Sequence, residues 1–260
     1  MTDPARKISV MAILNLTPDS YFAPSRHNMA QLSSGADIID IGAMSTRPGA
    51  ADVSEEEEWA RLAPVLSTLP EGLEISIDTF RSGIVRKAYA VLGRRFIVND
   101  ISAGDDDAAM LDTVAELGLD YAAMHKKGDP RTMQTLCRYE EGVTEAVLAY
   151  FDSFAARASR AGLKDWILDP GFGFAKTAEQ NYRLMLDLER FGRFGRKILV
   201  GVSRKSMIYR PLCITPEEAL PQTQALHMAA LERGADILRV HDPEEAFRTV
   251  RLYRMLHGLD

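Results

Sequence analysis

The chain of 260 residues contains little cysteine, no long run of apolar residues and no excess of positive charge. Cys137 and Cys213 are its only cysteines, too few for a disulfide framework and not spaced as metal ligands. No early apolar segment resembles a signal peptide or a membrane anchor, so we expect a cytoplasmic protein. The net charge of −6 argues against a nucleic-acid or membrane partner, because either would need a basic face.

Several common catalytic motifs are also missing. The segment GFGFAKT superficially resembles a phosphate-binding P-loop, but that pattern requires glycine where Pro170 and Ala175 stand. No pair of His and Glu residues has the spacing of a zinc site. The segment SRKS, which begins at Ser203, lacks the G-x-S-x-G elbow of a serine nucleophile. A nucleoside triphosphate, a zinc ion and a serine nucleophile are therefore not inferred.

What the sequence does contain is a regular alternation of short apolar runs and segments with helical periodicity. The apolar runs are bounded by Gly, Pro, Asn and Asp, which is typical of strands followed by turns. Strands are expected at 9–16, 37–41, 74–77, 96–98, 121–124, 166–168, 198–202 and 237–240. Helices are expected at 29–34, 55–69, 82–92, 107–117, 142–161, 178–190, 216–233 and 244–256. No break in composition marks a linker, so we expect one domain over residues 1–260.

Alternating strands and helices imply parallel strands joined by right-handed crossovers. Eight such units in 260 residues have the size of an α/β protein of the (β/α)8 TIM barrel class, which is the predicted fold. The alternative is an open doubly wound sheet, which would place polar residues mainly at one switch point. Here polar residues end almost every strand, as the mouth of a barrel requires: Asn15, Asp40, Asp78, Asn99, His125, Asp169, Lys205 and Arg239.

Two chemical classes of side chain would meet at this mouth. Asp78, Asn99 and Asp169 suit a ligand that presents adjacent N–H donors, because carboxylates accept paired, charge-assisted hydrogen bonds. The second class consists of cations and neighbouring hydroxyl groups, which suit phosphate oxygens: Arg47, Lys205, Arg239, His241, Ser45, Thr46 and Ser206. Together they indicate a planar, nitrogen-rich heterocycle attached to an anion.

Each of these residues also has a structural alternative. Asp169 can cap its own Gly-rich turn, and Asp78 can cap the helix that follows it. Arg239 can pair with Asp242 or with acids on the next strand. His241, taken alone, is more often structural than catalytic. That all of them fall at one rim of the predicted barrel favours a binding site.

Eight segments resemble the dihydropteroate synthase family: ILNLTPDSY, ADIIDIGAMSTRPGA, ISIDT, IVNDIS, MHKKGDPRTMQ, ILDPGFGF, VGVSRKSMI and ADILRVHD. They occur in the order of that family and at about its spacing, from Asn15 to Asp242. STRPGA and SRKS are the most specific of them. The resemblance therefore covers nearly the entire chain.

The resemblance implies a (β/α)8 barrel, usually a homodimer, that works in folate biosynthesis. Its members join 6-hydroxymethyl-7,8-dihydropterin diphosphate to p-aminobenzoate, giving 7,8-dihydropteroate and pyrophosphate. Mg²⁺ assists, and sulfonamides compete with p-aminobenzoate. An electron-rich dihydropterin can stabilise a cation at the methylene carbon that diphosphate leaves. We therefore favour a dissociative substitution without a protein nucleophile.

The matching motifs also imply residue roles. The pterin would be held by Asp78, Asn99, Asp169, Phe174 and Lys205, and the diphosphate by Asn15, Arg239 and His241, with Asn15 also at the Mg²⁺. p-Aminobenzoate would be bound by Thr46, Arg47, Pro48 and Ser206. Catalysis would involve Lys205, Asp78 and Arg47.

The chain departs from the family pattern in two loops. Where members usually have Asp-Gly-Gly in the first loop, this sequence has Ala23, Pro24 and Ser25, although Asp19 remains nearby. Ala43 and Met44 replace the usual Gly-Glu before STRP. Two alternatives stay open: a pterin-binding barrel methyltransferase that uses methyltetrahydrofolate, and an inactive pterin-binding relative that serves as a partner subunit. The first has no use for STRPGA or the SRKS lysine, whereas the altered first loop keeps the second open.

Overall fold

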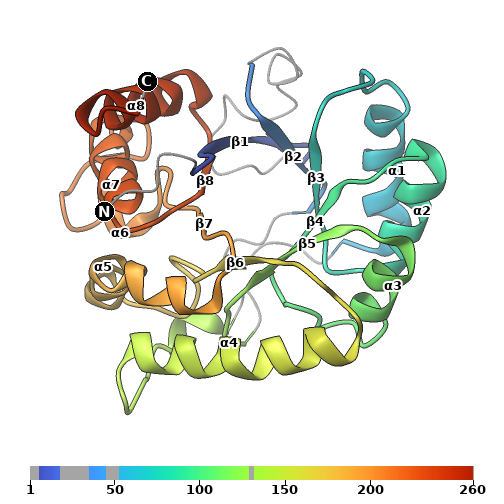
Figure 1. Ribbon diagram of the computed structural model, residues 1–260, viewed down its shortest axis with the longest axis horizontal. Helices are drawn as coiled ribbons and strands as arrows, with labels where there is room; N and C mark the ends of the chain where they lie inside the picture. The colour runs from blue at the N-terminus through green and yellow to red at the C-terminus, as the bar shows by residue number, and fades with distance from the viewer. Residues whose placement is uncertain (1–5, 18–34, 45–52, 129–131, 260) are drawn as a thin grey trace.

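The computed structural model describes residues 6–17, 35–44, 53–128 and 132–259. It contains a ring of strands surrounded by helices (Figure 1). The short helix expected at 29–34 lies outside the described residues, as do Asp19, Ala23, Pro24 and Ser25 of the first loop.

Eight parallel strands make up the sheet: β1 (Ser9–Asn15), β2 (Ile38–Gly42), β3 (Ile75–Asp78), β4 (Ile97–Asp100), β5 (Asp120–Met124), β6 (Ile167–Asp169), β7 (Leu199–Val200) and β8 (Ile237–Val240). Their order is β6-β5-β4-β3-β2-β1-β8-β7. A parallel bridge between Leu168 and Ile198 joins the two ends of this order. The Leu168 N–H also donates to the Lys197 carbonyl at 2.8 Å. The prediction of a (β/α)8 barrel is confirmed.

Helices separate most of the strands: α1 (Glu55–Leu66), α2 (Ser82–Leu92), α3 (Met110–Leu117), α4 (Val143–Arg160), α5 (Ala178–Leu186), α6 (Ser206–Tyr209), α7 (Leu220–Glu232) and α8 (Pro243–Leu256), with 3₁₀ turns η3 (Met133–Thr135) and η4 (Leu188–Phe194). In Figure 1 they form an outer layer around the strands. Within the described ranges, none of these helices is both long and apolar enough to cross a membrane.

Most described helices begin and end within three residues of the expected positions, and α5 and α7 differ most; the short helix α6 was not expected. The helix α5 ends at Leu186 and the chain continues as η4; the Asp187 carboxylate between them accepts from the Thr144 hydroxyl at 2.7 Å. The helix expected from residue 216 begins only at Leu220. The carbonyls just before it accept hydrogen bonds from the buried side chain of Arg204 instead of starting a helix.

Apolar side chains pack against both faces of the sheet. Between the strands and the helices lies the main core, in which the rings of Phe151 and Trp166 stack at 5.9 Å. A second cluster fills the lower part of the barrel interior: Met11, Ile38, Ile97, Ala122, Ile167, Leu199 and Ile237. Strands covered on both faces are near-continuously apolar, which is why short runs such as Trp166–Leu168 predicted them correctly.

Above the inner apolar cluster, toward the carboxyl ends of the strands, the inward positions become polar. Residues two apart in a strand share a face, so Asp40 lies above Ile38 on the inside of β2. In the sheet register Asp40 is adjacent to Ser76, and Asp78 is adjacent to Asn99. This polar layer lies at the end of the barrel where the active sites of such folds are found.

Candidate active site

Arg239 on β8 forms ion pairs with two carboxylates across the barrel interior, one on β2 and one on β3. Its Nε donates to Asp40 Oδ2 and its Nη2 to Asp78 Oδ2, each at 2.6 Å. The Asp40 side chain is fully buried. Burial raises the pKa of Asp78 to about 7, although the adjacent Arg239 charge acts in the opposite direction. Of the structural alternatives for Arg239, pairing with acids of other strands is therefore the one observed.

Asn99 forms a hydrogen bond with Asp40, one of the two carboxylates that pair with Arg239. Its Nδ2 donates to Asp40 Oδ2 at 3.1 Å. A carboxylate can only accept, so the amide group must face Asp40 and Oδ1 is left for another donor. Asp40 Oδ1 and the neighbouring Ser76 Oγ are buried and have no partner in the described part of the chain. Asp40 was noted in the sequence without a role, and it connects Asn99 to Arg239.

Asp169 ends β6 and begins a tight turn. Its Oδ1 accepts from the Gly171 N–H at 2.8 Å, so the sequence-based alternative, a cap of its own turn, is present in part. Within the described residues Oδ2 accepts no hydrogen bond, which leaves it available to a ligand. Burial raises the pKa of Asp169, and the Lys205 charge counteracts this effect. Gly171 is required here because its φ is +72° and a Cβ would lie 2.0 Å from the His125 carbonyl oxygen.

Lys205 returns from the loop after β7 toward the same interior. Its Nζ donates to the Phe172 carbonyl at 2.7 Å and lies 5.1 Å from the centre of the Phe174 ring. Burial lowers the pKa of Lys205 to about 8, while the Asp169 carboxylate raises it. A Cβ on Gly201 would lie 3.8 Å from this Nζ and 3.9 Å from Arg239 Cβ. The two predicted cations are thus neighbours across one glycine.

The sequence analysis missed a second buried lysine. Lys176 Nζ donates to the carbonyls of Gly171 and Phe174, at 2.8 and 3.0 Å, and lies 3.0 Å from His125 Nδ1. Burial lowers the pKa of Lys176 to about 7. Lys176 therefore fastens the turn that carries Asp169 and Phe174. The signal in the sequence is its place in the Gly-rich segment, two residues after Phe174.

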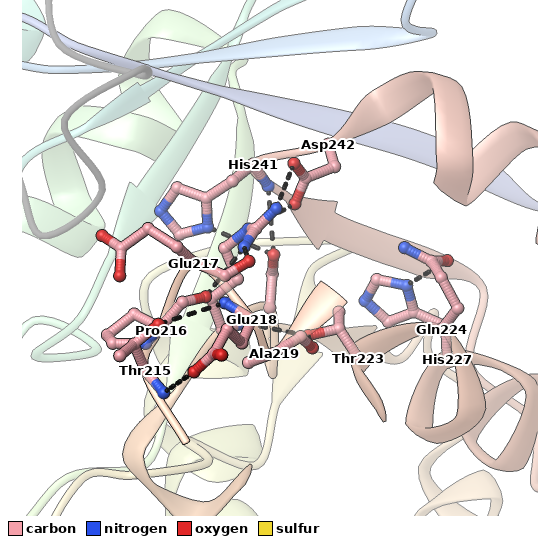
Figure 2. Close-up of polar contacts among 12 residues, drawn as sticks. Thr215, Pro216, Glu217, Glu218, Ala219, Thr223, Gln224, His227, His241 and Asp242 are labelled. Atoms are coloured by element: carbon pink, nitrogen blue, oxygen red, sulfur yellow. Dashed lines mark hydrogen bonds and ion pairs between the residues drawn. The ribbon is translucent and has the colours of Figure 1, made fainter. Parts of the chain in front are cut away.

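His241 and Ser206 lie at the edge of this cluster. His241 contacts Ser203 on the neighbouring loop, with both its backbone N–H and its Nδ1 at 3.2 Å from the hydroxyl oxygen. Ser206 is the first residue of α6, directly after Lys205. Figure 2 shows His241 beside Asp242. Asp242 pairs with Arg204 and not with Arg239, so that alternative is wrong.

Asn15 ends β1 next to the Arg239 cluster. A Cβ on Gly42 would lie 3.7 Å from Asn15 Oδ1 and 3.6 Å from Asp78 Oδ2, so both oxygens border the same point. Mg²⁺ prefers oxygen ligands and is commonly held by one or two protein groups together with substrate phosphates. The amide oxygen of Asn15 and the adjacent carboxylate fit that requirement.

Thr46, Arg47 and Pro48 lie outside the described residues. The described residues that flank this segment are Met44 and Val53, and both contact Arg81. Arg81 Nη2 donates to the Val53 carbonyl at 2.6 Å, and Arg81 Nη1 lies 3.1 Å from the Met44 sulfur. Their predicted part in p-aminobenzoate binding stays a prediction.

The described site combines acidic and basic side chains: Asp40, Asp78 and Asp169 with Arg239 and Lys205. Such an arrangement supplies both acceptors and donors to a polar heterocycle. No group in it is placed as an activated nucleophile within the described residues.

Comparison with known proteins is consistent over the whole chain. The model of the family described as "Pterin binding enzyme" matches residues 11–241. The dihydropteroate synthase of Escherichia coli K12 is 41% identical over 256 residues, covering 94% of this chain and 89% of that protein.

Solved structures show the same likeness. The Yersinia pestis dihydropteroate synthase with a sulfonamide drug complex has a TM-score of 0.89 at 35% identity, covering 99% of this chain and 96% of the other. The Thermus thermophilus enzyme in complex with 4-aminobenzoate has a TM-score of 0.86 at 34% identity, covering 98% and 96%. This chain therefore belongs to the pterin-binding enzymes, as a member of the dihydropteroate synthase family of transferases.

Proposed function

We propose that this chain, as one domain, joins 6-hydroxymethyl-7,8-dihydropterin diphosphate to p-aminobenzoate by a dissociative substitution. The observation that carries the proposal is the connected polar layer in which Asn99, Asp40, Arg239 and Asp78 contact one another. The relative solved with 4-aminobenzoate and the one solved with a sulfonamide support the same ligand chemistry, and we propose that sulfonamides compete here too.

The pterin is held by acceptors on one edge and donors on the other. Asp169 Oδ2 and Asn99 Oδ1 accept from the amino-pyrimidine N–H groups, and Asp78 completes the acidic side. Lys205 donates to the pterin ring from the opposite side, and the Phe174 ring packs on the pterin. Charge-assisted hydrogen bonds of this kind are the strong ones, and they fix orientation as well as affinity.

The diphosphate lies toward Arg239, His241 and Asn15. The Nη1 of Arg239 makes no hydrogen bond within the described residues and can donate to a phosphate oxygen. Because Asp40 and Asp78 balance the Arg239 charge, diphosphate needs further positive charge. When bound at Asn15 and Asp78, Mg²⁺ would neutralise the leaving group.

The reaction needs no protein nucleophile. Departure of diphosphate leaves a cation that the electron-rich dihydropterin delocalises, and Asp78 and Asp169 lie on the side where positive charge develops. Lys205 and Arg239 hold the pterin and the departing anion in place. Thr46, Arg47, Pro48 and Ser206 are proposed to bind p-aminobenzoate so that its amino nitrogen attacks the methylene carbon and then loses one proton to solvent, which gives the neutral C–N product.

We also propose that the protein is a cytoplasmic homodimer. One face of α8 exposes Leu252, Met255 and Leu256, which are 51%, 60% and 66% exposed. Residues three and four apart lie on one helix face, and a contiguous apolar face favours association. Sedimentation or light scattering of the purified chain tests the state, and a monomer at micromolar concentration would refute it.

The function is tested by measuring pyrophosphate release from the pterin diphosphate, with and without p-aminobenzoate, and with Mg²⁺ supplied or chelated. We expect dihydropteroate to form only with both substrates, and both dihydropteroate formation and pyrophosphate release to be lost on chelation. Pterin binding without turnover would identify an inactive relative. Methyl transfer from methyltetrahydrofolate would identify the alternative enzyme.

A further inference from the structure

The turn that delivers Lys205 contains an unusual residue. The Lys205 N–H donates to the Val202 carbonyl at 3.1 Å, which closes the turn, and Arg204 at its third position has a φ of +52°. That conformation suits glycine or asparagine, and a long side chain adopts it only where its surroundings over-determine it. The side chain of Arg204 must therefore have a role that a glycine would not fill.

The Arg204 guanidinium is buried and engaged on several sides. Its Nε and Nη2 donate to the two oxygens of Asp242 at 2.8 and 2.9 Å, a bidentate pair. Its Nη1 donates to the carbonyls of Pro216 and Glu217, both at 2.7 Å. The side chain is 5% exposed and that of Asp242 is 13% exposed. This geometry makes Arg204 a brace between segments and not a contact for substrate.

The brace joins three segments that meet at the mouth: the turn after β7, the chain before α7, and the start of α8. Figure 2 shows Asp242 and His241 on one side and Pro216 and Glu217 on the other. A second contact joins two of the same segments, because Ser203 in the turn after β7 forms hydrogen bonds with His241, which follows β8. Ser203, on one side of Arg204, is thus held to the residue that follows β8.

We propose that the Arg204–Asp242 pair is a positioning element that sets the direction of Lys205, and through Lys205 the affinity and turnover of the pterin substrate. This inference rests on the proposed function. An arginine–carboxylate fork fixes orientation as well as distance, and Lys205 follows Arg204 directly in a turn that its own N–H closes. When the fork is removed, the turn is free to relax from its left-handed conformation and carry Lys205 away from Phe172 and Phe174.

The chain supplies a matched control at the other end of the barrel. Arg6 Nε donates to Asp236 Oδ1 at 3.0 Å, with 17% and 18% of the two side chains exposed. Arg6 also donates to the carbonyls of Leu231 and Ala235. Like Arg204, Arg6 joins one carboxylate to two backbone carbonyls, although it contacts only one Asp236 oxygen, and it lies at the amino end of β8, far along the strand from the mouth.

The experiment compares Asp242→Asn and Arg204→Lys with Asp236→Asn and Arg6→Lys in the full chain. Pterin affinity is measured by calorimetry with free 6-hydroxymethylpterin, kcat and KM with both substrates, and thermal unfolding in parallel. We expect the mouth variants to lose about tenfold or more in pterin affinity and up to about a hundredfold in kcat/KM for the pterin diphosphate. For the control variants, pterin affinity and kcat/KM should stay within about twofold of wild type, even where their loss of Tm equals or exceeds that of the mouth variants.

A cycle with Lys205→Met tests whether the effect passes through Lys205. If it does, Asp242→Asn should cost little further affinity once the lysine is gone. Equal losses in the mouth and control pairs, or full additivity with Lys205→Met, would overturn the proposal. Arg204→Lys keeps the charge and serves if Asp242→Asn does not fold. Because free pterin is the probe, these results stay informative even if wild-type protein releases no pyrophosphate.

Discussion

Arg239 Nη2 lies 2.6 Å from Asp78 Oδ2, so the cation expected at the diphosphate and the acid expected at the pterin form one ion pair. The same guanidinium holds Asp40, which in turn orients Asn99. The two halves of the substrate site are therefore joined through side chains on four strands. A change at Arg239 should be felt by both the pterin and the diphosphate.

We expect Arg239→Ala to lower the free energy of unfolding by about 3–5 kcal/mol, because it leaves two buried carboxylates without their counter-charge. Affinity for free pterin should fall as well as affinity for the diphosphate ester. Chemical denaturation and calorimetry measure both. The control is Arg86→Ala, whose exposed pair with Glu116 is screened by water, so the free energy of unfolding should stay close to that of the wild type. Normal pterin binding by Arg239→Ala would show that the two subsites are independent.

The sequence predicted the barrel because each strand is an apolar run ended by polar residues and Gly or Pro. It also predicted which strand ends carry Asp78, Asn99, Asp169 and Arg239. It could not predict which acids Arg239 would pair with, since several carboxylates converge and only the closed barrel brings Asp40 and Asp78 within reach of its side chain.

The burial of Lys176 and the start of α7 could not be predicted from the sequence for a similar reason. Lys176 looks like a surface lysine until the turn at Gly171 brings two carbonyls and His125 around it. The start of α7 at Leu220 and not at residue 216 goes with hydrogen bonds from Arg204, a residue outside the helix, to the carbonyls of Pro216 and Glu217. Both depend on tertiary contacts that local patterns do not encode.

Asp169→Asn should weaken pterin binding without unfolding the protein. The Gly171 N–H can still be satisfied by the amide oxygen, but the position of Oδ2 then presents an N–H to the N–H groups of the pterin. The loss of a charged hydrogen bond costs on the order of 1.5–3 kcal/mol. Calorimetry with free pterin measures it, and unfolding midpoints establish that the fold is intact. An unchanged dissociation constant would remove Asp169 from the pterin site.

Gly171→Ala should damage the site through the backbone. The new Cβ would lie 2.0 Å from the His125 carbonyl oxygen, at a φ of +72°, so the turn must move. We expect a loss of at least about 2 kcal/mol in unfolding free energy together with weaker pterin binding. Gly118→Ala is the control, because its φ is +62° but no atom lies within 4 Å of a Cβ there. It should cost only about 1 kcal/mol and leave binding intact. Equal effects of the two substitutions would show that the close approach to His125 is unimportant.

The affinity for pterin should depend on pH through Lys205, whose pKa burial lowers to about 8. The protonated amine is the form that donates to the ring. As pH rises through about 8 the protonated fraction falls, and the dissociation constant should rise about tenfold per pH unit.

The charged groups that face Lys205 are Asp169, Arg239 and Asp78, of which Asp78 titrates near pH 7. Their ionisation, and that of the ligand, largely cancels in the ratio of wild-type to Lys205→Met affinity. That ratio should be constant below about pH 7 and should fall toward one above pH 8. Calorimetric titrations from pH 6 to 9.5 give the profile, and a ratio independent of pH would show that the charge of Lys205 makes no contribution to binding.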